Sequence, residues 1–337
     1  MAQLSTQRAP WHKPLKGKQT SPAAIQEATG TAFEVEKAET YVDVGDDTFA
    51  VIPGLLVMVR SDTRRPLAPV GPNVKLSQLD IHAEVADQIR KQTKGTFVTG
   101  GMLTNDTAHY VVKLAEQVTV AKDEIYDSYV ALLPQIGTTA LEVIFFGNRL
   151  ASHTTHIWGT TALRHGGDSA LEAKRLIGMA EVAAKEFVRD AKRMLANKIS
   201  FEQVGELYRL LWAQPTGKTQ KALSLWNNRC DELTEVWENS VSISEVRNTV
   251  YGVYVAAHEF TQYSRSLRGT SGDRALAEGL RSLDVLQGVS RSKSLVALEH
   301  LPEYKGTVTP AKVAKKPAAK STKAPAKTTA KRAAKAS

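Results

Sequence analysis

The chain has 337 residues, of which 42% are hydrophobic and 23% are charged, an ordinary globular composition that permits a sizeable core. Its single cysteine, Cys230, excludes an internal disulfide framework, and no uninterrupted apolar segment is long enough to span a bilayer as a helix. The net charge is +9, but ten of the Lys and Arg residues lie in residues 304–337, which contain no acid, and residues 33–303 alone carry −4.

The first 32 residues are rich in Pro, Lys, Gln, Ser and Thr and show no apolar periodicity, which predicts a disordered arm. They contain no apolar h-region of a secretory signal. Together with the lone cysteine this predicts a cytoplasmic protein, in a host cell if a phage encodes it, with no membrane partner.

Residues 33–150 have a mostly β pattern. The apolar run TFAVIPGLLVMV is broken by Pro53-Gly54, and VMVRSDTRRPLAPVG predicts two short strands joined by a polar turn. A helix is expected in SQLDIHAEVADQIRK, with Ser77 as its cap. A hairpin around Asn105-Asp106 follows, and SYVALLP and ALEVIFF are two further strand candidates.

Residues 165–300 have a mostly helical pattern. Ser169 and Glu172 have capping-box spacing at the start of a long helix, and Ser200 and Gln203 repeat that spacing before a helix that Pro215 ends. On the long helix one apolar face is predicted at Leu176, Ala180, Ala183, Phe187, Ala191 and Met194. Further helices are expected at 221–239, with a stripe of Leu223, Trp226, Cys230, Leu233 and Trp237, at 245–269, with a face of Val246, Val250, Val253, Ala257, Phe260 and Ser264, and within 273–300.

The sequence therefore predicts an α+β fold in one domain, residues 33–303, in which a β-rich first half packs with a helical second half. Residues 304–337 are predicted to be a disordered basic tail, because Lys alternates with Ala, Pro and Thr and large apolar groups are few.

Enzymatic motifs are weak throughout. PTGKTQ at 215–220 lacks the first glycine of a phosphate loop, so a helix–helix connection is the better interpretation. His153, His156 and His165 could approach a metal, but no cysteine or HExxH pattern supports them, and polar loop histidines are favoured over ligands. Cys230 lies on a helical stripe and is interpreted as a small core residue. We expect no cofactor and no metal, and the pattern favours a non-enzyme.

The tail has the composition of a DNA-attracting segment, because spaced cations on an extended chain release counterions when they meet a polyanion. It resembles the Lys-Ala-Pro tails of linker histones and of some bacterial nucleoid proteins, and the alternative is a solubilising extension or one that contacts RNA or an acidic protein. Its candidate nucleic-acid-binding residues are Lys312, Lys315, Lys316, Lys320, Lys323, Lys327, Lys331, Arg332 and Lys335. Because residues 33–303 are slightly acidic, any DNA contact by the core must be a local patch.

Several segments of residues 40–300 resemble the phage/plasmid-like family known as domain of unknown function 932. The resemblance rests on LAPVG at 67–71, TGGML at 99–103, the strand pair at 129–146, RLASHTT from Arg149, LRHGG at 163–167, NTVYGVYVAAHEFTQYSRSLRG and SRSKSLVAL. Ser152, Thr154 and Ala256 replace the family's usual cysteine and asparagines. The resemblance implies a phage or mobile-element origin and an α+β domain, and it does not imply any enzymatic reaction.

The main functional hypothesis is a non-enzymatic protein that binds single- or double-stranded DNA during replication, recombination or strand annealing, as a homo-oligomer. The candidate core-surface residues are Arg149, Arg164, His165, Arg265, Arg268, Arg291 and Lys293. A structural or host-interaction protein that contacts nucleic acid through the tail alone is the alternative. An enzyme acting on nucleic acid or nucleotides is the third hypothesis.

Overall fold

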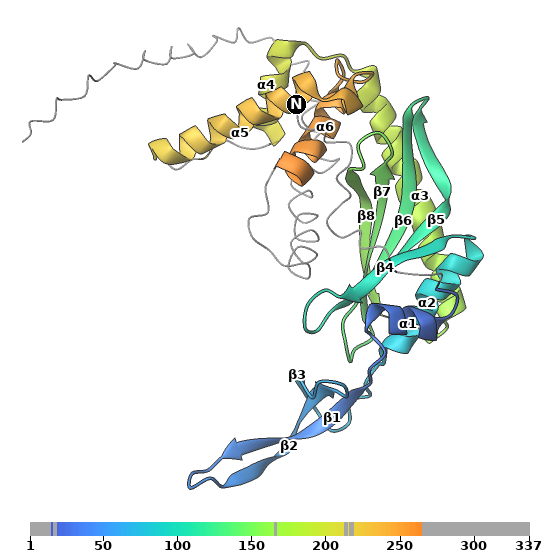
Figure 1. Ribbon diagram of the computed structural model, residues 1–337, viewed down its shortest axis with the longest axis vertical. Coiled ribbons are helices and arrows are strands. Elements are labelled where there is room, and N and C mark those ends of the chain that lie inside the picture. Colours follow the sequence, from blue (N-terminus) through green and yellow to red (C-terminus); the bar gives the residue numbers. More distant parts are fainter. Residues whose placement is uncertain (1–14, 16–18, 165–166, 212–214, 216–218, 265–337) are drawn as a thin grey trace, which may run out of the picture.

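A computed structural model describes residues 15, 19–164, 167–211, 215 and 219–264, and within this part the fold consists of two antiparallel sheets and a set of helices. The smaller sheet has the order β1-β2-β3 and the larger one the order β4-β5-β6-β7-β8 (Figure 1). The sheets come first in the chain and most of the helices follow. The predicted α+β class, with a β-rich first half and a helical second half, is confirmed.

The small sheet is a long hairpin with one short added strand. β1 (Val35–Asp43) pairs with β2 (Phe49–Arg60), and β3 (Pro66–Val70) joins β2 near its end. The expected break at Pro53-Gly54 does not divide β2, but the pairing jumps there: Glu39 faces Leu56 while Tyr41 faces Val51. Proline lacks the N–H that a ladder needs and Gly54 has φ of 75°, so the chain inserts extra residues instead of ending the strand.

The large sheet follows chain order. β4 (Thr96–Met102) and β5 (Ala108–Ala121) form the hairpin expected around Asn105-Asp106, and the other two predicted strands lie in β6 (Glu124–Pro134) and β7 (Ala140–Arg149). β8 (Thr155–Arg164) was not predicted, since its start was interpreted as a polar loop. It pairs with β7, and its polar start is buried against the helical half, where the Thr155 amide donates to Gln262 and the His156 ring contacts Tyr254.

Two helices pack at one end of the large sheet. α1 (Pro22–Thr29) lies inside the arm that was expected to be disordered; Ser21 caps it, Gly30 ends it with φ of 65°, and Ile25 is fully buried. α2 (Leu79–Gln92) occupies the predicted segment, but its N-cap is Gln78 with no side-chain bond. The expected cap at Ser77 is wrong, because that residue forms an isolated bridge with Gly137.

α3 (Ser169–Ala196) runs along the large sheet (Figure 1). All six residues predicted for its apolar face are buried, and each large side chain among them contributes roughly 1.5–3 kcal/mol. The cap is Asp168, whose carboxylate accepts from the amides of Ala170 and Leu171 at 3.0 Å, one residue before the predicted Ser169. None of the helices in the described part of the chain is both long and apolar enough to cross a membrane.

The remaining helices gather at the other end of the sheet. α4 (Phe201–Leu211) starts at the predicted box, where the Ser200 amide donates to Gln203 Oε1 at 2.9 Å, and it ends before Pro215. α5 (Gln220–Asn239) buries Trp226, Leu233 and Trp237 of its stripe and half-buries the other two. α4 ends at Leu211 and α5 begins at Gln220, so PTGKTQ falls between two helices as predicted, although residues 216–218 lie outside the described residues.

The last described helix is shorter and more deeply buried than expected. A 3-10 turn, η2 (Val241–Ile243), precedes α6 (Val250–Glu259), and a π turn, η3 (Phe260–Ser264), follows it. Every residue of α6 is buried, so the expected single apolar face is replaced by burial on all sides. The helices predicted within 273–300 fall outside the described residues.

Gly147 in β7 provides a test of this packing. A Cβ atom added there would lie 2.0 Å from Cζ2 of Trp158, a ring that is 5% exposed and stacked on Phe187. Replacing Gly147 by alanine should therefore destabilise the fold by about 1–3 kcal/mol in urea unfolding. The matched control is Gly178→Ala in α3, where nothing lies within 4 Å and alanine should stabilise the helix by about 1 kcal/mol.

Candidate nucleic-acid interface

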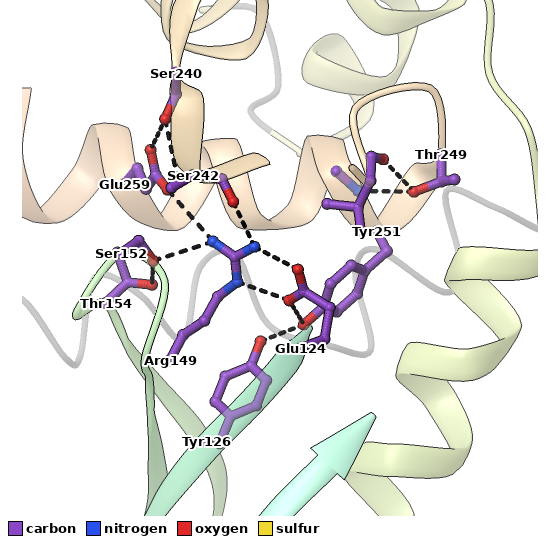
Figure 2. A network of polar contacts seen from close by, with 12 residues as sticks. Glu124, Tyr126, Arg149, Ser152, Thr154, Ser240, Ser242, Thr249, Tyr251 and Glu259 are labelled. Atoms are coloured by element: carbon purple, nitrogen blue, oxygen red, sulfur yellow. Dashed lines mark hydrogen bonds and ion pairs between the residues drawn. The ribbon is translucent and has the colours of Figure 1, made fainter. Parts of the chain in front are cut away.

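A buried charged centre joins the large sheet to the last helices, and Arg149 at the end of β7 is its middle (Figure 2). Its guanidinium forms a two-pronged ion pair with Glu124 of β6, at 2.7 Å from Nε to Oε2 and 2.5 Å from Nη2 to Oε1. Nη2 also donates to the Ser242 carbonyl at 2.7 Å. The two charged side chains are only 1% and 4% exposed, so this pair lies in the interior.

A second carboxylate faces the same arginine from α6. Glu259 lies 3.7 Å from Nη1 of Arg149, and its oxygens accept from the hydroxyls of Ser240, at 2.7 Å, and Ser242. Burial alone would lower the pKa of Arg149, but its hydrogen bonds to Glu124 and the charge of Glu124 outweigh burial and raise it. Arg149 therefore stays charged, as two buried carboxylates require.

Hydroxyl groups and a histidine extend the centre. Tyr251 of α6 donates to Glu124 Oε2 at 3.1 Å and shares a hydrogen bond with Tyr126 of β6. From Arg149 a chain of contacts passes through Ser152, Thr154 and His156 to Tyr254, at 3.3, 2.7, 2.8 and 3.2 Å. Burial raises the pKa of both Tyr126 and Tyr251, so both phenols remain protonated and available as donors.

The placement of Arg149 corrects one expectation. We expected its side chain on the core surface, but it is 1% exposed and its guanidinium is occupied by protein partners, so it does not contribute to a surface that DNA can touch. Ser152 and Thr154, which stand at family-motif positions, lie in the same cluster, and Ala256 is fully buried in α6. The hydrogen bonds and ion pairs of this centre connect β6 and β7 with η2 and α6.

Three buried histidines give the fold a pH dependence. Burial lowers the pKa of His109 to about 4 and that of His258 to about 3, and it lowers the pKa of His156 well below its ordinary value. The unfolded chain, with ordinary histidine pKa values, then binds more protons than the folded one below pH ~6.5. The contribution of these neutral histidines to the free energy of unfolding is therefore complete above pH ~6.5, and it is lost as the pH falls toward their pKa values in the folded state.

We expect each of these histidines to lower the free energy of unfolding by about 1.4 kcal/mol per pH unit between pH 6 and 5. Urea unfolding across this range measures the slope. In a His109→Gln variant, the dependence of the free energy of unfolding on pH should be shallower by about 1.4 kcal/mol per pH unit. An identical slope in the variant and the parent would contradict the prediction.

The outward side of α3 carries a row of exposed residues at three- and four-residue steps. We call it the α3 outer row, and it consists of Leu171, Lys174, Arg175, Gly178, Val182, Lys185, Arg189, Lys192 and Arg193. Because the buried residues of α3 fix the side that faces the sheet, these nine lie on the opposite side. From Lys174 to Arg193 the row extends for about 29 Å along the helix.

Six of the nine residues in the α3 outer row are Lys or Arg. The acidic residues of α3 are placed differently: Glu172 and Asp190 are buried, and Glu181 and Glu186 are exposed at the margins of the row. Arg189 forms an ion pair with Asp190 at 3.2 Å while its side chain remains 66% exposed. The row is therefore a local basic patch on a core that is acidic overall, which is the kind of surface that phosphate contacts need.

Sequence reasoning identified the buried face of α3 but overlooked this basic side. The signal was present in the sequence, because Lys and Arg recur at the α3 positions that lie opposite the predicted apolar face. Among the residues proposed from sequence, Arg164 is exposed at the end of β8. His165, Arg265, Arg268, Arg291, Lys293 and all nine tail residues fall outside the described residues.

The two histidines of SHTTHIWG lie in different environments. His153 is exposed in a turn with φ of 55°, as predicted for a loop residue. His156 is fully buried in β8, which corrects its expected loop position, and its ring stacks on His258 with centroids 4.1 Å apart. Across the described ranges, no group of three His, Cys, Asp or Glu side chains is arranged to hold a metal ion.

Fold and site together define an α+β protein in which a helix-covered antiparallel sheet presents a basic helical row and buries a charged centre. A family model described as "Domain of unknown function (DUF932)" matches residues 67–295, and the chain belongs to this family. The match includes the large sheet, α3 and the buried centre, while β1, β2 and residues 304–337 lie outside it. No curated protein and no solved structure matches the chain.

Proposed function

We propose that this protein binds DNA without enzymatic action and without sequence preference, through the α3 outer row and the Lys-rich tail. The observation that carries the proposal is the row itself: six exposed cations on one side of a helix in a core of negative net charge. Lys and Arg on one helical side contact phosphates and carry no base information, so the binding they support is general.

The distribution of acidic residues supports the same proposal. The exposed acids of α5 are Asp231, Glu232, Glu235 and Glu238, and the β1–β2 hairpin carries more. The negative charge of the core is thus concentrated on other elements than the α3 outer row. A nearly neutral core with separated charges can orient on a polyanion, because the local potential guides the encounter more than the net charge does.

The tail and the row have complementary roles in this proposal. Ten cations within 34 residues raise the local affinity for any nucleic acid, and the row on the folded core fixes how the core lies on the strand. Replication, recombination or strand annealing in a phage or another mobile element is the proposed setting, in keeping with the resemblance described above.

Fluorescence anisotropy of the full chain tests the proposal with labelled single- and double-stranded oligonucleotides of two unrelated sequences over a salt series. We expect equal affinities for the two sequences and a steep loss of affinity with salt, with about 0.7–0.9 counterions released for each phosphate contact. Strong preference for one sequence, or affinity independent of salt, would contradict the proposal. Hydrolysis of the oligonucleotides would favour the enzyme hypothesis instead.

A further inference from the structure

The far end of the β1–β2 hairpin exposes large apolar side chains. Cross-strand pairing places Tyr41 opposite Val51 and Asp43 opposite Phe49, so these four residues share one face of the hairpin. Phe49 is 64% exposed and Tyr41 is 55% exposed, and Val44 at the turn is 59% exposed. Aromatic and β-branched residues gathered at an exposed end are typical of a protein-binding surface.

The base of the hairpin is firmly held, so its end has a defined direction. Phe33, Val35 and Met58 pack with Val70, Leu79 and Ile136 in a separate apolar cluster, and Arg60 stacks on Phe33 at 3.9 Å. β3 pairs with β2 only near this base. The hairpin end therefore projects away from the large sheet as a two-stranded arm (Figure 1).

Charge restricts the surfaces that the hairpin end can meet. Residues 38–57 contain Glu39, Asp43, Asp46 and Asp47 and no Lys or Arg. Two such ends placed face to face would repel each other, so a symmetric hairpin-to-hairpin contact is disfavoured. The surface that fits must combine exposed apolar groups with positive charge.

The first half of the α3 outer row has this combination. Leu171 is 65% exposed and Val182 is 57% exposed, and Lys174 and Arg175 lie between them on the same side of the helix. The second half, from Lys185 to Arg193, is basic without an exposed large apolar residue. One exposed acid, Glu181, lies at the margin of the first half, against its two cations; Phe201, Leu225 and Val241 are exposed on other elements.

We propose that the hairpin end of one copy docks on the first half of the α3 outer row of a second copy. The two contact surfaces differ, so the contact is head-to-tail and successive copies form a closed ring or an open filament. The hairpin does not cover the second half of the row, which remains exposed to DNA in every copy. An assembly of this kind would align the basic rows of neighbouring copies along one strand.

The test measures the mass of the full chain by sedimentation equilibrium in the absence of DNA, beside two charge-reversed variants. One variant is Glu39→Lys/Asp43→Lys on the hairpin, and the other is Lys174→Glu/Arg175→Glu on α3. The parent should show masses above 36.7 kDa. Each variant alone should associate with about 100-fold lower affinity, because the hairpin variant loses the net negative charge of residues 38–57 and the α3 variant sets like charges against each other.

Mixing the two variants discriminates this contact from any other. In the mixture, the unchanged hairpin end of the α3 variant meets the unchanged row of the hairpin variant, which is the parental contact, so hetero-dimers should form at concentrations where each variant alone stays monomeric. A third variant, Tyr41→Ser/Phe49→Ser, removes exposed apolar area and should weaken association without changing the urea midpoint. A monomeric parent, or charge-reversed variants that associate like the parent, would overturn the proposal, and so would a mixture that fails to associate.

Discussion

Replacing Arg149 by methionine should lower the free energy of unfolding by about 3–5 kcal/mol, the largest stability effect expected in this fold. The substitution leaves Glu124 and Glu259 buried without the cation that both carboxylates face. Desolvating a carboxylate without a partner costs several kcal/mol, and the two acids would also repel each other. Because β6 and α6 meet at this centre, the loss should loosen the contact between the sheet and the last helices.

Urea unfolding at pH 7 measures the effect, and Arg149→Lys is the matched variant. Lysine keeps the charge but cannot make the two-pronged bond to Glu124 and the bond to the Ser242 carbonyl together, so its loss should be smaller. Adding Glu124→Met to Arg149→Met removes one unpaired charge and should recover part of the stability. A loss of unfolding free energy below about 1 kcal/mol for Arg149→Met would show that the buried centre does not hold the sheet to the last helices.

Replacing Lys185, Lys192 and Arg193 by glutamine should weaken DNA binding of the full chain by about 10–100-fold at low salt. Each lost phosphate contact also reduces the slope of log affinity against log salt by about 0.7 on single strands and about 0.9 on duplex DNA. Three lost contacts therefore make the slope shallower by about 2–3. These residues lie in the second half of the α3 outer row, away from the proposed hairpin contact.

The matched control replaces three exposed lysines elsewhere, Lys75, Lys122 and Lys221, by glutamine. It changes the net charge by the same amount, so a general charge effect would weaken both triple variants equally. We expect the control to keep nearly the parental salt slope, measured by anisotropy on the same labelled strands. Equal losses in both variants would remove the special role of the α3 outer row.

The elements that the sequence predicts well are those in which a local pattern decides the structure. The apolar face of α3 follows from a period that only a helix satisfies, and the hairpin between β4 and β5 follows from turn residues between two β-rich runs. The caps lie one residue away from Ser77 and Ser169. Asp168 accepts from the amides that Ser169 was expected to cap, and Ser77 bridges to Gly137 while Gln78 at the cap position makes no side-chain bond.

The buried centre could not be predicted because its partners are distant in sequence. Arg149 pairs with carboxylates that come from β6 and from α6, and no local pattern connects these three residues. A charged residue is usually at the surface, so Arg149 was placed there. β8 was missed for a related reason: its first residues are polar, and only their hydrogen bonds to the helical half explain their burial.

DNA binding by a chain that ends at Glu303 tests the central claim most directly, since this chain keeps the α3 outer row and lacks the tail. We predict that it still binds single-stranded DNA at low salt, with a salt slope of about −2 to −3 from three or four phosphate contacts. The full chain should bind more tightly and with a steeper slope. If the shortened chain shows no binding at any salt concentration, the tail alone contacts nucleic acid, and the proposed role of α3 is wrong.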